Sequence, residues 1–130
     1  EILTEAKKWL DVYFFGEEPN FTPLLHPNGS TFRKAVWQIL LDIPYGQTIT
    51  YGEIARRIAV MKNTSHMSAQ AVGGAVGHNE ISIIIPCHRV VGTNGSLTGY
   101  AGGIDKKISL LKLEHTDMSC LFIPKKGTAL

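Results

Sequence analysis

A cysteine with a histidine beside it is the feature of this sequence that most directly suggests chemistry. Cys87 and His88 follow an apolar stretch, residues 81–85, and precede a glycine-rich stretch, residues 92–103. We expect the first stretch to be a short, buried, extended segment and the second to be a flexible loop. This position suits a nucleophile, because a rigid buried segment precedes it and a flexible loop follows it.

A thiol nucleophile needs a base, since a free cysteine has a pKa near 8.5 and only a few per cent is thiolate at neutral pH. His88 can take the proton of Cys87 directly or through a water, and a carboxylate can orient the imidazole. Glu114 is the best candidate carboxylate, because it ends the last predicted helix and can fold back. The structural alternative is an unreactive buried thiol, which is the commoner outcome for a lone cysteine beside a histidine.

Two other cysteine chemistries lack support in the sequence. Zinc sites use spacings such as C-x-x-C or H-x-x-x-H, and neither spacing occurs around Cys87 or Cys120. A cysteine protease needs histidine and asparagine partners, and nothing local marks them. We therefore expect neither a metal nor a cofactor.

The elements that must position this motif are predicted to be mainly helical. Apolar residues recur at helical spacing over residues 2–14 and again over residues 32–43. The proline-containing stretch between them, residues 17–29, is predicted to be an extended linker. A last helix is predicted from residue 104 to near residue 114.

A helix-turn-helix is predicted between residues 51 and 76. Thr50 and Glu53 form a capping-box pattern, in which each side chain can bond to the other's backbone N–H, and a short helix begins there. A polar loop at residues 62–66 leads to a second helix at residues 67–76. Two helices joined by a polar turn are common, so this pattern alone favours packing helices of a bundle.

The second helix of that pair has an unusual face of small residues: Ala69, Ala71, Gly73, Gly74 and Ala75. Each glycine costs a helix ~1 kcal/mol relative to alanine, so another interaction must offset the loss. Close packing between helices is one explanation. A helix pressed into a DNA minor groove, which is only about 6 Å wide, is the other. The spacing supports both explanations equally.

The composition indicates a globular protein of one domain, with part of a second. The chain has 130 residues, 44% of them hydrophobic, and a net charge of +2 that neither requires nor excludes nucleic acid. There is no apolar run that could span a membrane and no signal peptide, and two cysteines do not make a disulfide scaffold. We expect a cytoplasmic protein without a membrane partner. Because the chain opens at Glu1, we also expect sequence upstream of it.

The sequence resembles the O6-alkylguanine-DNA alkyltransferases, also called methylated-DNA–protein-cysteine methyltransferases. The run Ile83-Ile84-Ile85-Pro86-Cys87-His88-Arg89-Val90 is similar to the active-site signature of that family. The similarity covers roughly residues 28–115 and includes Phe32, Val36, Trp37, Pro44-Tyr45-Gly46, Thr50-Tyr51, Ala71-Val72-Gly73-Gly74-Ala75, Asn79, Gly99-Tyr100, Gly102-Gly103, Leu110-Leu111 and Glu114.

The resemblance implies a set of catalytic residues. Cys87 would accept the alkyl group, His88 would act as its base through a water, and Glu114 would orient His88. Asn79 would brace the turn between the recognition helix and the active-site loop. Tyr51 would donate to the flipped guanine or to a nearby phosphate.

The resemblance also implies a substrate pocket and a DNA-binding surface. The pocket would be lined by Pro86, Val90, Tyr100 and Ala101. The helix at residues 67–76 would be the recognition helix in the minor groove, which decides between the two explanations of its small residues. The DNA contacts would come from Gln70, Ala69, Ala71, Gly73, Tyr51 and Arg89.

The activity implied by the resemblance is DNA repair by irreversible alkyl transfer from O6-alkylguanine, and from O4-alkylthymine, in double-stranded DNA. The product is a thioether, which water does not readily hydrolyse, so each monomer would act once as a suicide methyltransferase. The alternative is a non-catalytic alkyltransferase-like protein, but such relatives replace the acceptor cysteine and Cys87 is present. A helix-turn-helix transcription factor would need longer polar side chains on its second helix.

The expected fold class is mainly α, a small helical domain with a winged helix-turn-helix, preceded by a remnant of an α/β amino-terminal domain. Residues 1–26 would be the end of that domain, residues 27–116 the DNA-binding alkyltransferase domain, and residues 117–130 a tail. The zinc ligands that some members carry in the amino-terminal domain are missing from this sequence. Gln70 also stands where many relatives have an arginine, and Ala101 where some have a serine.

Overall fold

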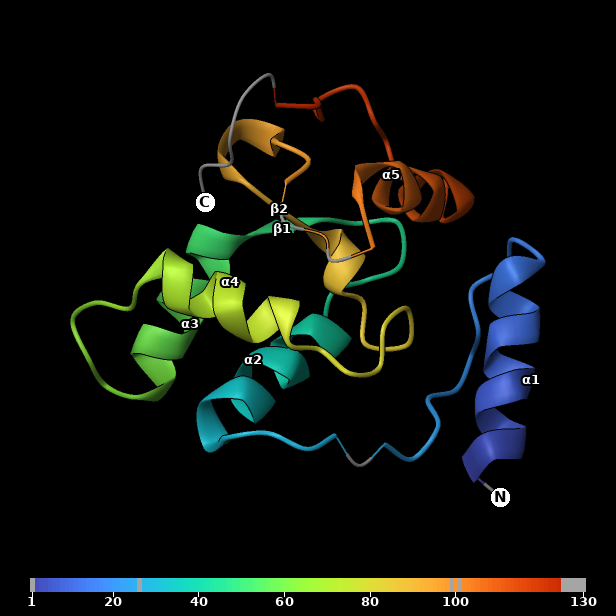
Figure 1. The fold of residues 1–130 in the computed structure, drawn as a ribbon, viewed down its shortest axis with the longest axis horizontal. Coiled ribbons are helices and arrows are strands. Elements are labelled where there is room, and N and C mark those ends of the chain that lie inside the picture. Colours follow the sequence, from blue (N-terminus) through green and yellow to red (C-terminus); the bar gives the residue numbers. More distant parts are fainter. Residues whose placement is uncertain (1, 26, 99, 101, 125–130) are drawn as a thin grey trace.

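The computed structural model describes residues 2–25, 27–98, 100 and 102–124. Over these residues the chain is mainly helical, as predicted (Figure 1). The helices are α1 (Ile2–Phe14), α2 (Thr31–Leu41), α3 (Tyr51–Met61), α4 (Ala69–Gly77) and α5 (Ile104–Leu113), with the 3-10 turns η1 (Cys87–Arg89) and η2 (Thr93–Gly95). Two short strands, β1 (Ile49–Thr50) and β2 (Val90–Val91), pair in parallel, Ile49 with Val90 and Thr50 with Val91. None of the described helices is long and apolar enough to cross a bilayer.

Side-chain caps set the first residues of the three central helices. Ser30 accepts from the backbone N–H of Arg33 at 3.1 Å, and Thr50 accepts from that of Glu53 at 3.1 Å. Ser68 caps α4, so that helix begins at Ala69, two residues later than predicted. The capping box of α3 is half formed, because the Glu53 carboxylate pairs with Arg56 at 2.7 Å.

Helices α2, α3 and α4 pack around one apolar core that holds the helix-turn-helix together. Val36, Leu40, Ile54, Ile58 and Val72 are all fully buried in it. Trp37 of α2 is also buried, and its indole Nε1 donates to the Ala75 carbonyl of α4 at 2.8 Å. The second helix of the pair is therefore fixed through its buried face, and its opposite face is left to solvent.

The prediction of an extended segment at residues 81–85 is wrong, because these residues form a tight turn. The Ile85 N–H bonds to the Ile81 carbonyl at 3.0 Å, and Ile83 has a φ of 75°, a region that β-branched residues rarely adopt. Asn79 holds both sides of the turn: its Oδ1 accepts from Ile81 N at 3.0 Å and its Nδ2 donates to Ile85 O at 2.8 Å. These bonds satisfy the Ile81 N–H and the Ile85 carbonyl, which a neighbouring strand would satisfy if the segment were extended.

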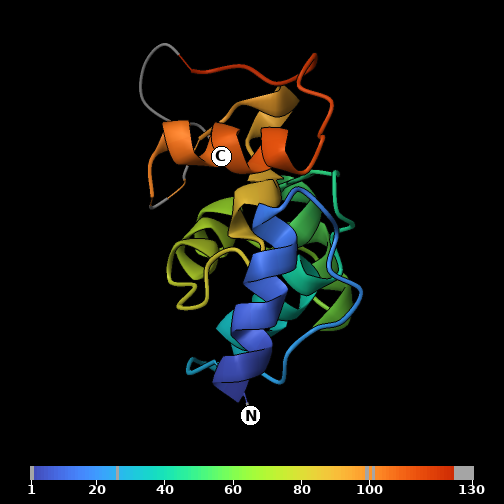
Figure 2. The ribbon, with the colours of Figure 1, turned by 90° about the vertical axis from the view of Figure 1, so that its right-hand side faces the viewer.

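Helix α1 lies apart from the helix-turn-helix and packs on the other side of the active-site turn (Figure 1). Figure 2 shows its carboxyl end beneath α5 and close to η1. A second apolar cluster joins these parts, with Trp9 and Tyr13 from α1, Ile84 from the tight turn and Leu110 from α5. The helix thus reaches the segment that carries Cys87.

Candidate active site

Cys87 begins η1, directly after the tight turn that Asn79 holds. Its side chain is only 7% exposed and its thiol is free, as is that of the exposed Cys120. Burial raises the pKa of the Cys87 thiol, while hydrogen bonding to Asn79 and Ser82 and the charge of Lys107 act in the opposite direction. The resting thiol therefore stays protonated, and its reaction requires a proton acceptor.

His88 and Glu114 form a buried pair beside the thiol. Glu114 caps the end of α5, and its Oε2 lies 2.6 Å from His88 Nε2, with both side chains fully buried. Burial lowers the pKa of His88 in spite of the nearby carboxylate, so the imidazole is neutral at pH 7. Because a carboxylate can only accept, Nε2 carries the hydrogen and Nδ1 keeps its lone pair. Nδ1 is buried and has no hydrogen-bond partner among the described residues.

Arg89, predicted from the resemblance as a DNA contact, is turned inward. Its Nε donates to Glu114 Oε1 at 2.8 Å, its Nη2 to Oε2 at 3.0 Å, and its Nη1 to the Ile43 carbonyl at 2.8 Å. Three of its five N–H donors are therefore engaged inside the protein. Burial alone would raise the pKa of Glu114, but the bonds from His88 and Arg89 outweigh it and lower that pKa to about 2.

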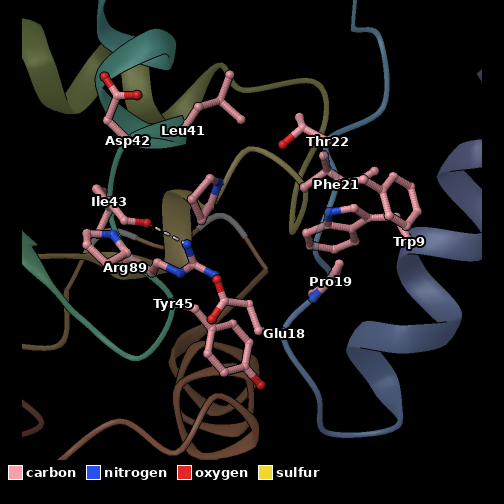
Figure 3. Close-up of a pocket in the computed structure, with 13 residues that line it drawn as sticks. Trp9, Glu18, Pro19, Phe21, Thr22, Leu41, Asp42, Ile43, Tyr45 and Arg89 are labelled. Atoms are coloured by element: carbon pink, nitrogen blue, oxygen red, sulfur yellow. Dashed lines mark hydrogen bonds between the residues drawn. The ribbon is translucent and has the colours of Figure 1, made fainter.

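A cavity of about 180 Å³ lies next to Arg89, between the active-site segment and the amino-terminal part of the chain. Figure 3 shows Arg89 bonded to Ile43 on one wall, with Trp9 of α1 and Pro19 of the linker opposite. Pro86, predicted as a pocket residue, also lines this cavity.

Tyr13 is a residue of this site that the sequence analysis missed. It is fully buried, and its hydroxyl donates to Glu114 Oε2 at 2.6 Å and lies 3.4 Å from His88 Nε2. The helical pattern of residues 2–14 marks it only as one apolar position among several. No local signal connects it to residues 75 and 101 positions away.

Lys107 is the second missed residue. It is fully buried on α5, and its Nζ donates to the Thr98 carbonyl at 2.8 Å and to the Val90 carbonyl. Burial lowers its pKa to about 8, while the charge of Cys87 acts to raise it. A sequence signal exists here, because Lys107 falls on the same helical stripe as Ile104 and Leu111.

The remaining predicted pocket residues surround Cys87 to different extents. Tyr51 is buried and donates to the Thr98 carbonyl at 3.3 Å, and burial together with Cys87 raises its pKa to about 12. Tyr100 is partly exposed, and the same two causes raise its pKa. Val90 is fully buried in the central core. Ala101 lies outside the described residues.

The predicted DNA-binding residues of α4 lie on its open face. Gln70, Ala71, Gly74 and Gly77 are exposed, while Ala69 and Gly73 are partly so. A Cβ atom added at Gly74 or Gly77 would meet no atom within 4 Å among the described residues. Packing within the chain therefore does not explain why these two positions are glycine.

The comparisons with known proteins identify the family. Residues 31–116 match the model of the DNA-binding domain of 6-O-methylguanine DNA methyltransferases. The chain belongs to this family. It is 52% identical over 114 residues to a methylated-DNA–protein-cysteine methyltransferase of Methanosarcina acetivorans, covering 88% of this chain and 70% of the relative.

Further members of the methyltransferase family support the assignment. A methylated-DNA–protein-cysteine methyltransferase of Mycobacterium tuberculosis is 51% identical and covers 82% of this chain, which spans 62% of that relative's length. The crystal structure of Mycobacterium tuberculosis OGT in complex with DNA superposes with a TM-score of 0.76 and 50% identity, covering 85% of this chain and 66% of that one. The predicted family and the helical DNA-binding fold are confirmed. Helix α1 lies outside the matched residues.

Proposed function

We propose that this member of the methyltransferase family repairs alkylated guanine in double-stranded DNA, with Cys87 as the acceptor. The observation that carries the proposal is a buried thiol followed directly by a histidine whose Nε2 bonds to a buried carboxylate at 2.6 Å. Family membership gives this arrangement its substrate class. Each monomer would act once, because its nucleophile is consumed.

In the proposed reaction the thiolate of Cys87 attacks the alkyl carbon. A sulfur–carbon bond forms while the carbon–O6 bond breaks, and the bonding electron pair leaves with guanine. The thiol proton passes to His88, directly or through a water, and guanine gains a proton or hydrogen bond from a donor such as Tyr51. Because the pKa of Tyr51 is raised to about 12, its hydroxyl stays a proton donor at neutral pH.

The proposed binding mode presses α4 into the minor groove with the target nucleotide flipped out of the stack. The open face of α4, with Gly74 and Gly77, leaves room for a close approach to a groove about 6 Å wide. Gln70 is exposed on that face and would fill the space of the flipped base. As a neutral side chain it would do so without the charge that an arginine adds. Flipping costs a few kcal/mol, which the DNA contacts must supply.

Cys87→Ala tests the proposed acceptor. It is expected to abolish methyl transfer from O6-methylguanine DNA while binding of that DNA persists, because only the acceptor sulfur is removed. Intact-protein and peptide mass spectrometry should find one added methyl on the Cys87 peptide of the unsubstituted protein. Cys120→Ala is the matched control, since that thiol is free and exposed, and it should transfer at the full rate. A methyl group on Cys120, or binding with no transfer by the unsubstituted protein, would contradict the proposal and favour a non-catalytic lesion-binding protein.

A further inference from the structure

The hydroxyl of Tyr13 occupies a fixed position at the catalytic pair. Its ring stacks on Trp9 with centroids 5.2 Å apart and lies edge-on to His88 at 6.4 Å. Tyr45 also meets this ring edge-on, at 6.3 Å. Because the ring is fully buried among these neighbours, its hydroxyl is directed by packing as well as by its own hydrogen bonds.

The hydrogen bonds of Tyr13 allow only one arrangement of protons. Burial and the bond to Glu114 raise the pKa of Tyr13 far above its ordinary value, so the phenol keeps its single proton. That proton is directed to Glu114 Oε2 at 2.6 Å. The phenol oxygen, 3.4 Å from His88 Nε2, can then only accept. Glu114 and Tyr13 therefore both require a hydrogen on Nε2.

Glu114 is held from two directions. Arg89 bonds to both of its oxygens, through Nε to Oε1 and through Nη2 to Oε2. Tyr13 adds a neutral donor to Oε2, the oxygen that also accepts from His88. The carboxylate is fixed in orientation, and its charge on Oε2 is shared among three donors. Sharing that charge weakens its attraction for a second proton on His88.

We propose that Tyr13 is a positioning residue for alkyl transfer, which keeps His88 in the neutral form with hydrogen on Nε2 and a bare Nδ1. This inference rests on the proposed function, since Nδ1 matters because it receives the proton of Cys87. It also makes α1 part of the catalytic machinery, although the matched DNA-binding domain begins at residue 31. Two cations also act on this pair. Arg89 bonds to Glu114, and the positive charges of Arg89 and Lys107 lower the pKa of His88.

Tyr13→Phe tests the inference, because it keeps the ring and removes only the hydroxyl. Glu114 Oε2 then loses one of three donors and attracts an imidazolium more strongly, so the pKa of His88 should rise. The transfer rate at pH 7 should fall about tenfold, the usual loss for one buried hydrogen bond. The acid limb of the pH–rate profile should move to higher pH. Nitrogen-15 NMR of the His88 ring should show protonation beginning at a higher pH than in the unsubstituted protein.

Tyr45→Phe is the matched control. It removes a tyrosine hydroxyl from the same aromatic cluster, one whose bonds to Gly16 O and Leu113 O are both long, at 3.4 Å. Its pH–rate profile should be unchanged. If Tyr13→Phe lowers stability but keeps the profile and the His88 titration, Tyr13 is structural only and the inference is wrong.

A measurement on the unsubstituted protein covers the case in which Tyr13→Phe does not fold. His88 should titrate from a neutral ring with hydrogen on Nε2, and the Tyr13 hydroxyl proton should exchange slowly and resonate downfield. A ring with hydrogen on Nδ1 would overturn the inference. These spectra do not depend on transfer, so a protein that shows them but moves no methyl group would contradict the proposed function and leave the arrangement of protons standing.

Discussion

Burial and nearby polar groups have opposite effects on the pKa of the Cys87 thiol. Burial raises the pKa of this thiol. Hydrogen bonds with Asn79, Ser82 and the backbone lower it, and so does the positive charge of Lys107. Lys107 is itself buried. It donates to the carbonyl of Val90, before the glycine-rich loop, and to that of Thr98, within the loop. A charge without solvent around it acts over a short distance with little screening. Lys107 is thus placed to favour the thiolate at the moment of attack.

Replacing Lys107 with methionine should raise the pKa of Cys87 and slow transfer. One unit in that pKa is tenfold in thiolate, so we expect a rate about tenfold lower at pH 7. Because the pKa of Lys107 is about 8, the cation is lost above that pH, and the two rates should converge as the pH rises through it. Stopped transfer assays from pH 6 to 10 measure this. Lys106→Met, at the exposed neighbouring position, is the control. Two profiles with the same ratio at every pH would rule out the electrostatic role.

Helix α4 has a buried face and an open face. Val72, Ala75 and Val76 are buried against the other helices, and the exposed residues of the opposite face are small apart from Gln70. A glycine at an open helical position lowers the stability of the free protein, and at Gly74 no neighbour among the described residues requires it. The proposed minor groove, outside the chain, would account for glycine at these open positions.

Gly74 allows this idea to be tested. Gly74→Ala should stabilise the free protein by up to ~1 kcal/mol, because the added methyl group meets open space and alanine favours the helix. Gly74→Leu should keep the fold but weaken binding to duplex DNA more than tenfold, because its side chain would stand between helix and groove. Urea unfolding and fluorescence anisotropy measure the two effects. Ser109→Leu adds the same side chain to an exposed position of α5 and should leave affinity unchanged. Equal affinities for all three variants would remove α4 from the DNA interface.

The elements were predictable where local rules determine them. The apolar stripes of α1, α2, α3 and α5 and the Thr50 cap depend on residues within one or two turns. The tight turn at residues 81–85 was not predictable, because its bonds come from Asn79 and its apolar composition also suits a strand. Arginine is a residue type that often contacts DNA, but the carboxylate that turns Arg89 inward belongs to a residue 25 positions away.

At the scale of the whole molecule, Glu114 joins segments that are distant in sequence. Through hydrogen bonds and ion pairs its carboxylate contacts Tyr13 of α1 and His88 and Arg89 of η1, and Arg89 continues to Ile43 after α2. A single ionised group therefore ties the amino-terminal helix, the active-site segment and the end of α5 together. Breaking one partner of a buried ion pair leaves the other charge uncompensated, which makes this centre important for folding as well as for chemistry.

The stability of the protein should therefore fall in acid through Glu114. Its pKa is about 2 in the folded protein against an ordinary value of 4.5, so the unfolded chain binds the proton more readily. The stabilisation is complete above about pH 4.5 and is lost as the pH falls toward 2, by about 3 kcal/mol at most. His88 adds an earlier loss, since burial lowers its pKa and the unfolded chain takes up a proton from about pH 6.5 downward.

Urea unfolding of Glu114→Gln between pH 3 and 8 separates these contributions. The variant should be less stable at pH 7, because Arg89 loses its carboxylate, and its stability should no longer decline below pH 4.5 through residue 114. The earlier decline from His88 should remain. Glu53→Gln is the control: its ion pair with Arg56 is exposed, so it should shift stability by less than about 1 kcal/mol at every pH. If the curve of Glu114→Gln runs parallel to that of the unsubstituted protein down to pH 3, the carboxylate is not the group whose protonation loosens α1, η1 and α5.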